Sequence, residues 1–231
     1  MTQRDIPPVQ RTRAGPLDVS AIDSVEVLAR YAAGCVACPL YRGATQTVFG
    51  RGPDNASIMV VGEQAGDEED KRGEPFVGAS GRLLEEALEQ AGLDRGAVYI
   101  TNAVKHFKWK PSGNRRLHQK PSISEIAACY PWLQAEIRIV APQIIVCLGV
   151  TASQAIFQKR VTLRELGTMP HVAPHGGTAL ATFHPSAILR MPDQEQRVKA
   201  FEGLVRVLSS ARGYVSRDDL GEYREDFTAL T

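Results

Sequence analysis

Short apolar runs alternate with longer amphipathic segments along most of this chain. Four runs rich in Val and Ile predict buried strands, at Ser57–Gly62, Val98–Asn102, Gln143–Leu148 and Ala179–Thr182. Five segments have the period of a helix, several opened by a Ser or Thr that can cap it, at Ser24–Ala33, Ser80–Ala91, Ser122–Val140, Thr151–Phe157 and Glu195–Ala211. Buried strands that alternate with helices are typical of a parallel sheet covered on both faces. The pattern therefore predicts an α/β fold, a three-layer α/β/α sandwich with a central four-stranded parallel sheet.

The two ends of the chain lack this pattern. Residues 1–22 show no periodicity and contain Pro7, Pro8 and Pro16, which is typical of a flexible arm. Residues 213–231 are dense in Arg, Asp and Glu and predict a charged tail. A chain of 231 residues with 43% hydrophobic content can bury one good core. We therefore expect a single domain over residues 23–212, between the arm and the tail.

Composition narrows the cellular setting. No apolar run approaches the length of a membrane span, and the first residues are polar and contain proline, unlike a secretion signal. We therefore expect a soluble, cytoplasmic protein that has no membrane partner and is a monomer. Four cysteines are too few for a disulfide scaffold, and in a reducing compartment close cysteines favour a metal or a cluster.

Polar residues follow three of the predicted strands. The first strand leads into Gly62–Asp67, the second ends in Thr101 and Asn102, and the fourth leads into Phe183–Ser186. The carboxyl ends of parallel strands lie along one edge of an open sheet, where ligands bind. The sequence therefore predicts that three distant segments converge on one site.

Two loops near this edge carry candidate chemistry. Glycines surround the carboxylates Glu63 and Asp67, a composition that disfavours nucleotide phosphate, and the alternative is a glycine turn with solvated acids. Phe76 lies between glycine and proline turns, where its ring either faces a flat ligand or packs under its own loop. Pro185 directs His184 out of the sheet, although a histidine at a strand end is more often structural than catalytic.

The most basic part of the chain lies between Val104 and Lys120, which holds six Lys or Arg, two His, two aromatic residues and no acid. Because the whole chain has a formal charge of only +1, this block is local and favours contact with a phosphate backbone. His118 follows Arg115 and Arg116, and neighbouring cations favour a neutral, nucleophilic imidazole. The alternative is a solvated basic loop with an incidental histidine.

The cysteines suggest a metal or cluster site. Cys35 and Cys38 have the spacing at which two thiolates bind one metal or cluster, and Cys129 is a third candidate ligand. Cys147 lies within the third apolar run, where a cysteine usually behaves as a small core residue. His106 is then the nitrogen donor that would complete the set, since imidazole replaces thiolate at some iron-sulfur centres.

Taken together, five motifs resemble those of the iron-sulfur family 4 uracil-DNA glycosylases. They are Gly62–Asp67 (GEQAGD), Pro75–Gly78 (PFVG), Thr101–His106 (TNAVKH), Arg115–His118 (RRLH) and His184–Ser186 (HPS). The basic loop that ends in histidine more narrowly resembles the UdgX-type subgroup, which becomes covalently attached to DNA from which it has removed uracil. The resemblance runs from about Cys35 to Leu208 and implies a uracil-DNA glycosylase-like fold.

The resemblance implies a role for each matched residue. Phe76 would stack on flipped uracil, Asn102 would read its polar edge, and His184 would stabilise negative charge on the departing base. His118 would bond to the sugar, and Arg116 would hold the basic loop in place. The other implied site residues are Glu63, Gln64 and Asp67 beside His118, and Lys105 and Gly66 for substrate binding.

The resemblance also implies a 4Fe-4S cluster with the ligands Cys35, Cys38, His106 and Cys129. Ala65 stands where the subgroup usually has proline, which leaves that loop with more freedom. The implied activity is excision of uracil from DNA followed by cross-linking of His118 to C1′ of the abasic sugar. Single-stranded DNA is the expected substrate form, and double-stranded DNA is the alternative.

Three other functions stay open at this point. An ordinary glycosylase would release free abasic DNA over many turnovers, with His118 serving only DNA binding. A flavodoxin-like electron carrier would use an iron-sulfur centre without acting on DNA. A non-catalytic DNA-binding module would use the basic block alone, and would leave Glu63, Asn102 and His184 without a purpose.

Overall fold

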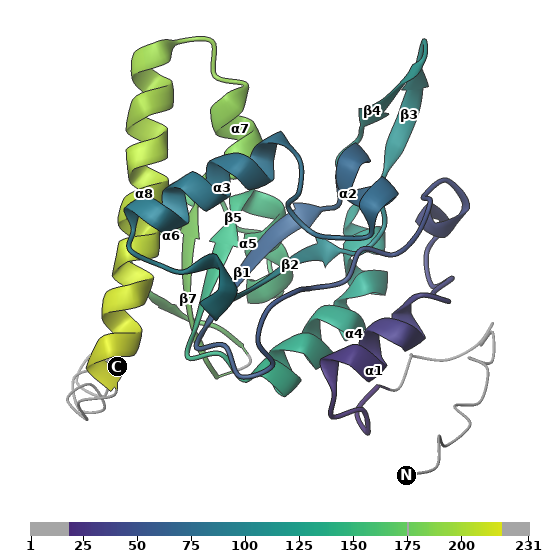
Figure 1. The fold of residues 1–231 in the computed structure, drawn as a ribbon, viewed down its shortest axis with the longest axis horizontal. Coiled ribbons are helices and arrows are strands. Elements are labelled where there is room, and N and C mark those ends of the chain that lie inside the picture. The colour runs from purple at the N-terminus through teal and green to yellow at the C-terminus, as the bar shows by residue number, and fades with distance from the viewer. Residues whose placement is uncertain (1–18, 175, 219–231) are drawn as a thin grey trace.

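Five strands form the central sheet of the computed structural model, which describes residues 19–174 and 176–218 (Figure 1). In order across the sheet they are β2 (Val98–Val104), β1 (Ile58–Gln64), β5 (Ile144–Leu148), β7 (Thr178–Thr182) and β6 (His171–Val172). The first four are parallel, and β6 pairs antiparallel with β7. The four predicted parallel strands are therefore confirmed, and the sheet has one additional edge strand. That strand is too short to leave a periodic pattern in the sequence.

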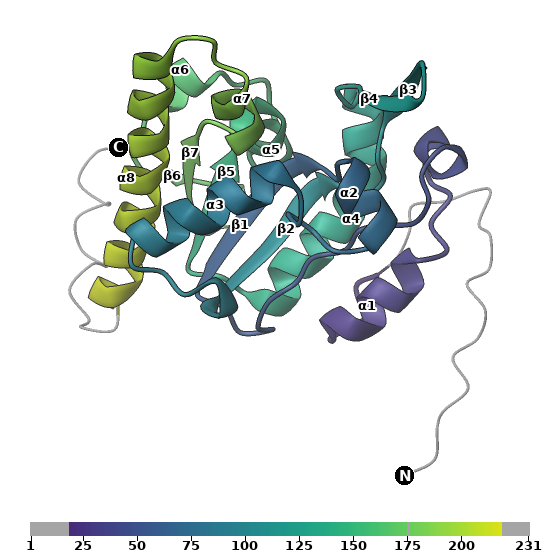
Figure 2. The same cartoon turned by 45° about the horizontal axis from the view of Figure 1, so that its top comes forward.

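Helices cover both faces of this sheet, as Figures 1 and 2 show. One face carries α1 (Val25–Ala32), α4 (Ile123–Val140), α5 (Gly149–Phe157) and α6 (Leu163–Leu166). The other face carries α3 (Ala79–Gln90), α7 (Pro185–Leu189) and α8 (Gln194–Asp218). Short helices lie in the connections, at α2 (Asp67–Arg72), η1 (Pro39–Arg42) and η2 (Arg95–Ala97). The predicted α/β/α sandwich is confirmed.

Successive strand residues enter the two cores alternately. In β1, Val61 packs in the core that α1, α4 and α5 cover, whereas Val60 packs in the core of α3 and α8. Neighbouring strands keep the same register, since Val60 pairs with Ile100 on β2 and with Val146 on β5. Every residue of β2 and β5 is buried. Burial on both faces explains why these strands are continuous apolar runs in the sequence.

Most helix boundaries agree with the sequence to within a few residues. Ser24 and Ser122 cap α1 and α4 as expected, since each side chain accepts a hydrogen bond from a backbone N–H of the first turn. The helix expected to open at Ser80 has Gly78 as its N-cap, and the helix expected from Thr151 begins two residues earlier. Within the described residues, no helix is long and apolar enough to cross a membrane.

Packed structure extends slightly beyond residues 23 and 212. α8 continues to Asp218. At the other end, Val19 is buried, and Arg138 donates hydrogen bonds to the carbonyls of Val19 and Ile22. The rest of the proposed arm and tail, residues 1–18 and 219–231, lies outside the described residues.

Both edges of the sheet are covered by short segments. On the outer side of β2, Arg51 and Ile100 exchange backbone hydrogen bonds of 2.9 and 2.8 Å. The Val48 N–H donates to the Lys105 carbonyl at 2.7 Å, just beyond the end of the same strand. At the opposite edge, β6 occupies the outer side of β7.

The basic block folds into a β-hairpin, not the loop expected from the sequence. β3 (Trp109–Ser112) pairs antiparallel with β4 (Arg115–His118), and Gly113 and Asn114 form the turn. Gly113 has a φ of 57°, which favours glycine, and Gly-Asn between two short runs is a hairpin signal. The hairpin stands away from the sandwich near α2 (Figures 1 and 2). Because His118 is its last residue, the place of His118 depends on what holds the two strands.

A buried ion pair joins the end of β2 to α4. The side chains of Lys105 and Glu136 are 1% and 0% exposed, and Lys105 Nζ lies 2.5 Å from Glu136 Oε2. The ammonium also donates to Thr101 Oγ1 (2.6 Å) and to the Asn102 carbonyl (2.7 Å). Glu136 Oε1 accepts further hydrogen bonds from the Tyr99 hydroxyl, from Thr101 and from a backbone N–H. Both charges are therefore fully paired, as buried charges require.

Replacing Lys105 with Met should lower the free energy of unfolding by about 3–5 kcal/mol, because Glu136 is left buried without its counter-charge. The double variant Lys105→Met with Glu136→Gln removes both charges, keeps an acceptor oxygen for Tyr99, Thr101 and Gly50, and should recover most of this loss. Denaturant unfolding followed by circular dichroism measures both variants. A Lys105→Met protein as stable as the unaltered one would contradict this account of the pair.

Candidate active site

The end of β1 brings an amide and an aromatic ring together. Gly62 pairs with Asn102 of β2 in the parallel register. A Cβ atom at Gly62 would lie 2.3 Å from Asn102 Oδ1 and 2.6 Å from Phe76 Cζ, far inside van der Waals contact. The missing side chain of Gly62 is therefore what allows the amide and the ring to meet at the strand end.

Asn102 has an unpaired acceptor. The residue is 2% exposed, and its Oδ1 has no hydrogen-bond partner among the described residues. Leaving a buried acceptor unpaired costs about 1–3 kcal/mol, so such groups are rare in native proteins. An acceptor of this kind at the end of a strand indicates a group that hydrogen-bonds a ligand.

Phe76 is held in an unusual backbone conformation. Its φ is 56°, in the left-handed region that a bulky residue rarely adopts. α3 packs closely beneath it, since a Cβ atom at Gly81 would lie 1.7 Å from the Phe76 carbonyl oxygen. The ring is partly exposed and faces His184, with 5.8 Å between the ring centroids and 30° between the planes. Strain of this kind concentrates at functional sites, and here it places a ring face beside Asn102.

His184 is the N-cap of α7, and its contacts fix which ring nitrogen carries the proton. Nδ1 accepts a hydrogen bond from the Ser186 backbone N–H at 3.1 Å. In the neutral ring the proton is therefore on Nε2, which acts as a donor. Burial, together with the nearby Arg190 and His118, lowers the pKa of His184 to about 4. At neutral pH, His184 is an uncharged hydrogen-bond donor next to Phe76.

His118 faces a carboxylate. Its Nε2 lies 3.5 Å from Glu63 Oε1, and Glu63 Oε2 accepts a 2.5 Å hydrogen bond from the Thr151 hydroxyl. Partial burial lowers the pKa of His118, Glu63 raises it in part, and Arg190 lowers it again. The net direction is downward, so the imidazole is neutral at pH 7.

The arginines expected to keep His118 neutral are not the ones that do so. Partial burial has the largest effect on the His118 pKa, and the cation that adds to it is Arg190 of the α7 region. Side chains alternate along a strand, so Arg115 points to the opposite face of β4 from His118. Arg116 is engaged by carboxylates. Cations and a carboxylate were expected to act on this pKa in opposite directions, and burial with Arg190 outweighs Glu63, whereas Arg115 and Arg116 are not among the causes.

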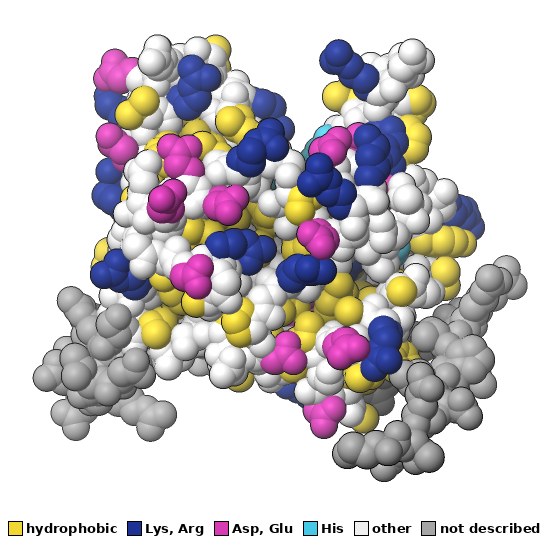
Figure 3. Space-filling model, viewed as in Figure 1, with side chains coloured by type: hydrophobic (Ala, Val, Ile, Leu, Met, Phe, Trp, Pro, Cys, Tyr) yellow, Lys and Arg dark blue, Asp and Glu magenta, His cyan; other side chains and the backbone are white. Residues whose placement is uncertain are grey.

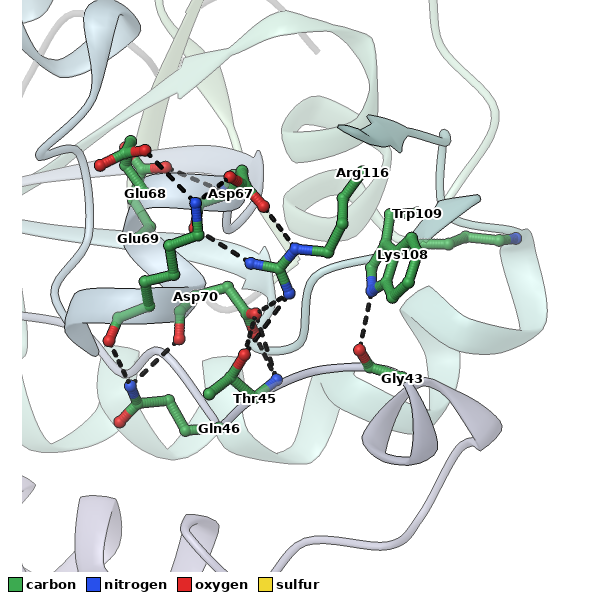
Figure 4. A network of polar contacts seen from close by, with 12 residues as sticks. Gly43, Thr45, Gln46, Asp67, Glu68, Glu69, Asp70, Lys108, Trp109 and Arg116 are labelled. Atoms are coloured by element: carbon green, nitrogen blue, oxygen red, sulfur yellow. Dashed lines mark hydrogen bonds and ion pairs between the residues drawn. The ribbon is translucent and has the colours of Figure 1, made fainter. Parts of the chain in front are cut away.

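Arg116 holds the hairpin against α2 (Figure 4). Its Nε lies 2.5 Å from Asp67 Oδ1, and its Nη1 lies 2.5 Å from Asp70 Oδ2. Asp70 is 0% exposed and also accepts hydrogen bonds from the Thr45 backbone N–H and hydroxyl. Two carboxylates thus fix a charged side chain that stands two residues before His118 in β4.

Gln64 and Gly66 fix the backbone where the chain leaves β1. Gln64 is buried, and its amide donates to the carbonyls of Lys108 and Gln119 at 3.2 and 3.1 Å. It also accepts from the Lys108 N–H at 3.2 Å, so it joins the two ends of the hairpin. Gly66 is the N-cap of α2 and donates its N–H to Glu69. These two residues therefore set the base of the hairpin and the start of α2.

Lys105 is placed differently from the other matched residues. Its ammonium lies in the buried ion pair with Glu136 and points into the core. Its link to the site is the hydrogen bond to the backbone carbonyl of Asn102.

Three of the four cysteines share one neighbourhood. The pKa of Cys129 is raised to about 12, mainly by burial, with smaller contributions from Cys35 and Cys38 that Lys105 opposes. The Lys105 backbone N–H donates to Cys129 Sγ, and the Trp132 indole N–H donates to Cys35 Sγ, both at 3.2 Å. Thiols from the turn before η1 and from α4 are therefore neighbours.

Cys147 and His106 are the two candidates for a fourth ligand beside these thiols. Cys147 is buried in β5, and burial alone raises its pKa, as expected for a core cysteine. His106 is 4% exposed, and burial lowers its pKa while Asp70 raises it in part. A buried, neutral imidazole is a suitable nitrogen ligand. In the part of the chain that the structure describes, no group of three or more His, Cys, Asp or Glu is arranged to hold a metal ion.

A hollow separates the hairpin from the α7 side of the molecule. Figure 3 shows it at the top of the view, with acidic and basic side chains and a histidine along its edge. The residues described above supply an unpaired amide, a ring face, a neutral imidazole donor and a second neutral imidazole beside a carboxylate. Such a set can bind a flat polar ring, stabilise negative charge on it and attack an electron-poor carbon.

Three residues that contact or influence this site were not among the sequence candidates. Asp70 lies in an acidic run that is typical of a solvated helix, Thr151 was expected only to open a helix, and Arg190 follows the histidine motif at a distance. One signal was available for Asp70. Its spacing of three residues from Asp67 places both carboxylates on one face of α2, where they can share one cation.

Comparisons with known proteins agree with this arrangement. Residues 49–208 match the uracil DNA glycosylase superfamily. The chain is 39% identical over 186 residues to the Type-4 uracil-DNA glycosylase of Thermotoga maritima, covering 80% of this chain and 93% of that protein. It is 42% identical over 180 residues to the Type-4 enzyme of Sulfurisphaera tokodaii, covering 74% of this chain and 79% of that protein.

A relative of another type is also similar. The Type-5 uracil-DNA glycosylase of Pyrobaculum aerophilum is 32% identical over 177 residues, covering 65% of this chain and 72% of that protein. The superfamily match spans more than half of the chain, and the Type-4 relatives are matched over most of their length. This chain therefore belongs to the uracil DNA glycosylase superfamily and, within it, to the Type-4 uracil-DNA glycosylases.

Proposed function

We propose that this protein excises uracil from DNA and is then joined covalently, through His118, to C1′ of the abasic sugar. One observation carries the proposal. The neutral imidazole of His118 lies beside Glu63 and near enough to His184 to lower the pKa of His184. A nucleophile therefore stands next to the groups that would hold the base.

Recognition would use Phe76 and Asn102. Uracil within a duplex is out of reach and must be flipped from the stack, at a cost of a few kcal/mol. Stacking on the Phe76 ring would offset part of this, since a base–aromatic contact contributes about 1–3 kcal/mol. The unpaired Asn102 Oδ1 can accept a hydrogen bond from N3–H of uracil, whereas N3 of cytosine is itself an acceptor. The same atom would therefore favour uracil over cytosine.

Base excision breaks the bond from C1′ to N1 of uracil. The electron pair moves to the base, which leaves as an anion, and the sugar gains cationic, oxocarbenium-like character. Neutral His184 can donate its Nε2–H to a uracil carbonyl oxygen, and this hydrogen bond strengthens as the charge develops. The Glu63 carboxylate would stabilise the positive charge of the sugar.

Capture would follow at C1′. A ring nitrogen of neutral His118 shares its lone pair with the electron-poor carbon, and the ring becomes an imidazolium that keeps its other N–H. Charge balances, because one uracil anion leaves for each imidazolium formed. A positioned nucleophile has an effective concentration of up to about 10⁵–10⁸ M, far above that of water. The protein would therefore complete one turnover and stay on the DNA.

A 4Fe-4S cluster bound by Cys35, Cys38, Cys129 and His106 is part of this proposal. Cys35 raises the pKa of Cys38, and both raise the pKa of Cys129, so the three thiols are close together. Cys35 and Cys129 also accept N–H hydrogen bonds of the kind that surround cluster thiolates. When bound, such a cluster would tie the turn at Cys35–Cys38 to α4 and to the end of β2, which are far apart in the sequence. The excision and capture steps use the side chains of the site alone.

Replacing His118 with Ala should abolish the covalent product while base excision continues, because a different residue stabilises the departing base. The unaltered protein, mixed with a uracil-containing oligonucleotide, should give a species that survives boiling in detergent. Mass spectrometry of its peptides should place the added DNA on His118. An adduct on another side chain, or the release of many uracils per molecule of unaltered protein, would contradict the proposal.

His171→Ala is a matched control for this experiment. His171 lies in β6 at the sheet edge, and its Nε2 contacts the Leu166 carbonyl. This variant removes an imidazole from the fold without touching the proposed site. Its adduct should therefore form as in the unaltered protein.

Adduct formation should depend on pH through His118. The pKa of this imidazole is lowered from 6.5, so the lone pair is present at neutral pH and is lost only as the pH falls through a midpoint below 6.5. In Glu63→Gln, the charge that raises the His118 pKa is gone, so the midpoint should move to still lower pH. Adduct yield after a short fixed time, measured across a pH series, tests both. A midpoint above 6.5 in the unaltered protein would exclude this role for a neutral His118.

The cluster ligands can be tested separately. Cys38→Ala, Cys129→Ala and His106→Ala should each lower the iron and sulfide content and the visible absorption of the purified protein. Cys147→Ala should retain them, because Cys147 is a core residue of β5. Loss of iron in Cys147→Ala together with its retention in His106→Ala would exchange the two assignments.

A further inference from the structure

Trp109 lies directly opposite His118 in the hairpin. The two residues are paired in the antiparallel register of β3 and β4. Paired residues are held at a fixed separation by the backbone ladder, so the position of one strand determines that of the other. A group that fixes Trp109 therefore also fixes His118.

The indole of Trp109 is attached to a distant part of the chain. Its Nε1–H donates to the Gly43 carbonyl at 2.7 Å, a contact drawn in Figure 4. Gly43 is the C-cap of η1, and Cys38 is the N-cap of the same short helix. The hairpin is thus joined to the turn that carries two of the thiols.

The indole ring makes a second set of contacts. The Arg116 guanidinium lies 5.5 Å from the Trp109 ring centroid and 5.2 Å from that of Phe107. Trp109 also packs against the small buried cluster formed by Val48, Ala65 and Phe107. One side chain therefore contacts the η1 turn, the arginine that binds α2 and the core below the hairpin.

These contacts are distinct from those that would hold the base. Phe76 and His184 face each other, and Asn102 lies at the end of β2, all outside the hairpin. Trp109 holds the strand that ends in His118. Its contacts given above include none with Phe76, His184 or Asn102. Its loss should change where the nucleophile stands and leave base recognition as it is.

We propose that Trp109 is a positioning residue for the capture step, an inference that rests on the function proposed above. Its N–H bond to Gly43 and its contact with Arg116 keep β3 in place, and β3 keeps His118 within reach of C1′. Without these contacts, water would compete better for the sugar after uracil has left. More of the product would then be free abasic DNA.

The experiment measures how the excised sites divide between adduct and free abasic DNA, with protein in excess and after all uracil has been released. This ratio does not depend on how much of a variant is folded, because an unfolded molecule releases no uracil. Trp109→Phe keeps a ring and removes the N–H donor, whereas Trp109→Ala removes both sets of contacts. The ratio of adduct to free abasic DNA should fall several-fold in Trp109→Phe. In Trp109→Ala it should fall on the order of a hundredfold, the cost of displacing a reacting group by about 1 Å.

Tyr41→Phe is the matched control, because it removes a polar atom from an aromatic side chain of the same η1 turn. The Tyr41 hydroxyl accepts a hydrogen bond from Arg42 and, within the described residues, makes none with the hairpin. Its ratio should equal that of the unaltered protein. In all three variants, the rate of uracil release should stay unchanged.

Two outcomes would separate this inference from the proposed function. If the unaltered protein forms the adduct and Trp109→Ala divides its products in the same ratio, the inference is wrong and the proposed function stands. If the unaltered protein forms no adduct at all, the proposed function is wrong and the inference is wrong with it. Equal loss of excision and capture in both Trp109 variants would also overturn the inference, because Trp109 would then serve the whole site.

Discussion

The site depends on the empty space that Gly62 leaves at the end of β1. Parallel pairing sets this residue beside Asn102, and any side chain there would collide with both the Asn102 amide and the Phe76 ring. The two residues that meet at this space are each in an unfavourable state. Asn102 keeps an unpaired buried acceptor, and Phe76 keeps a strained backbone, so the fold around them must be stable enough to hold both. The fully paired Lys105–Glu136 charges, which also bind the Asn102 carbonyl, fix the position of the β2 backbone at Asn102.

The second requirement of the site is a neutral imidazole within a basic hairpin. Burial lowers the pKa of His118, and two basic side chains of this segment are paired with acids. Arg116 contacts Asp67 and Asp70, and Lys108 lies 2.9 Å from Glu125. These pairs attach the hairpin to α2 and α4. These paired charges therefore hold the hairpin, and with it His118, in place.

Periodic, buried elements were predictable because each carries its pattern in adjacent residues. The four parallel strands are continuous apolar runs, and α4 opens with Ser122 and Glu125, which cap each other's backbone as the sequence suggests. The hairpin had a local signal in Gly113-Asn114, but its basic composition favoured a loop. The convergence of β1, β2 and β7 ends on one edge followed from the topology of parallel sheets.

Contacts between distant residues could not be predicted in the same way. A lysine within a basic block is typical of the surface, and nothing near Lys105 indicates that Glu136, on the second helix turn beyond Cys129, will accept its charge. The backbone of Phe76 is set by the packing of α3, which no residue type encodes. Residues adjacent in the sequence were also a poor guide to the charges around His118. Side chains alternate along β4, so Arg115 points away from His118, and the cation that lowers the His118 pKa is Arg190 from another element.

The short segments along the two sheet margins affect how separate copies of this protein meet. An open margin exposes a row of amide and carbonyl groups onto which a strand of another molecule can add. Here Arg51 already occupies the margin of β2, and β6 occupies that of β7. Within the described residues, neither long parallel strand offers an uninterrupted template for such addition. Separate copies of this protein can therefore approach one another closely without pairing β2 or β7 into a common sheet.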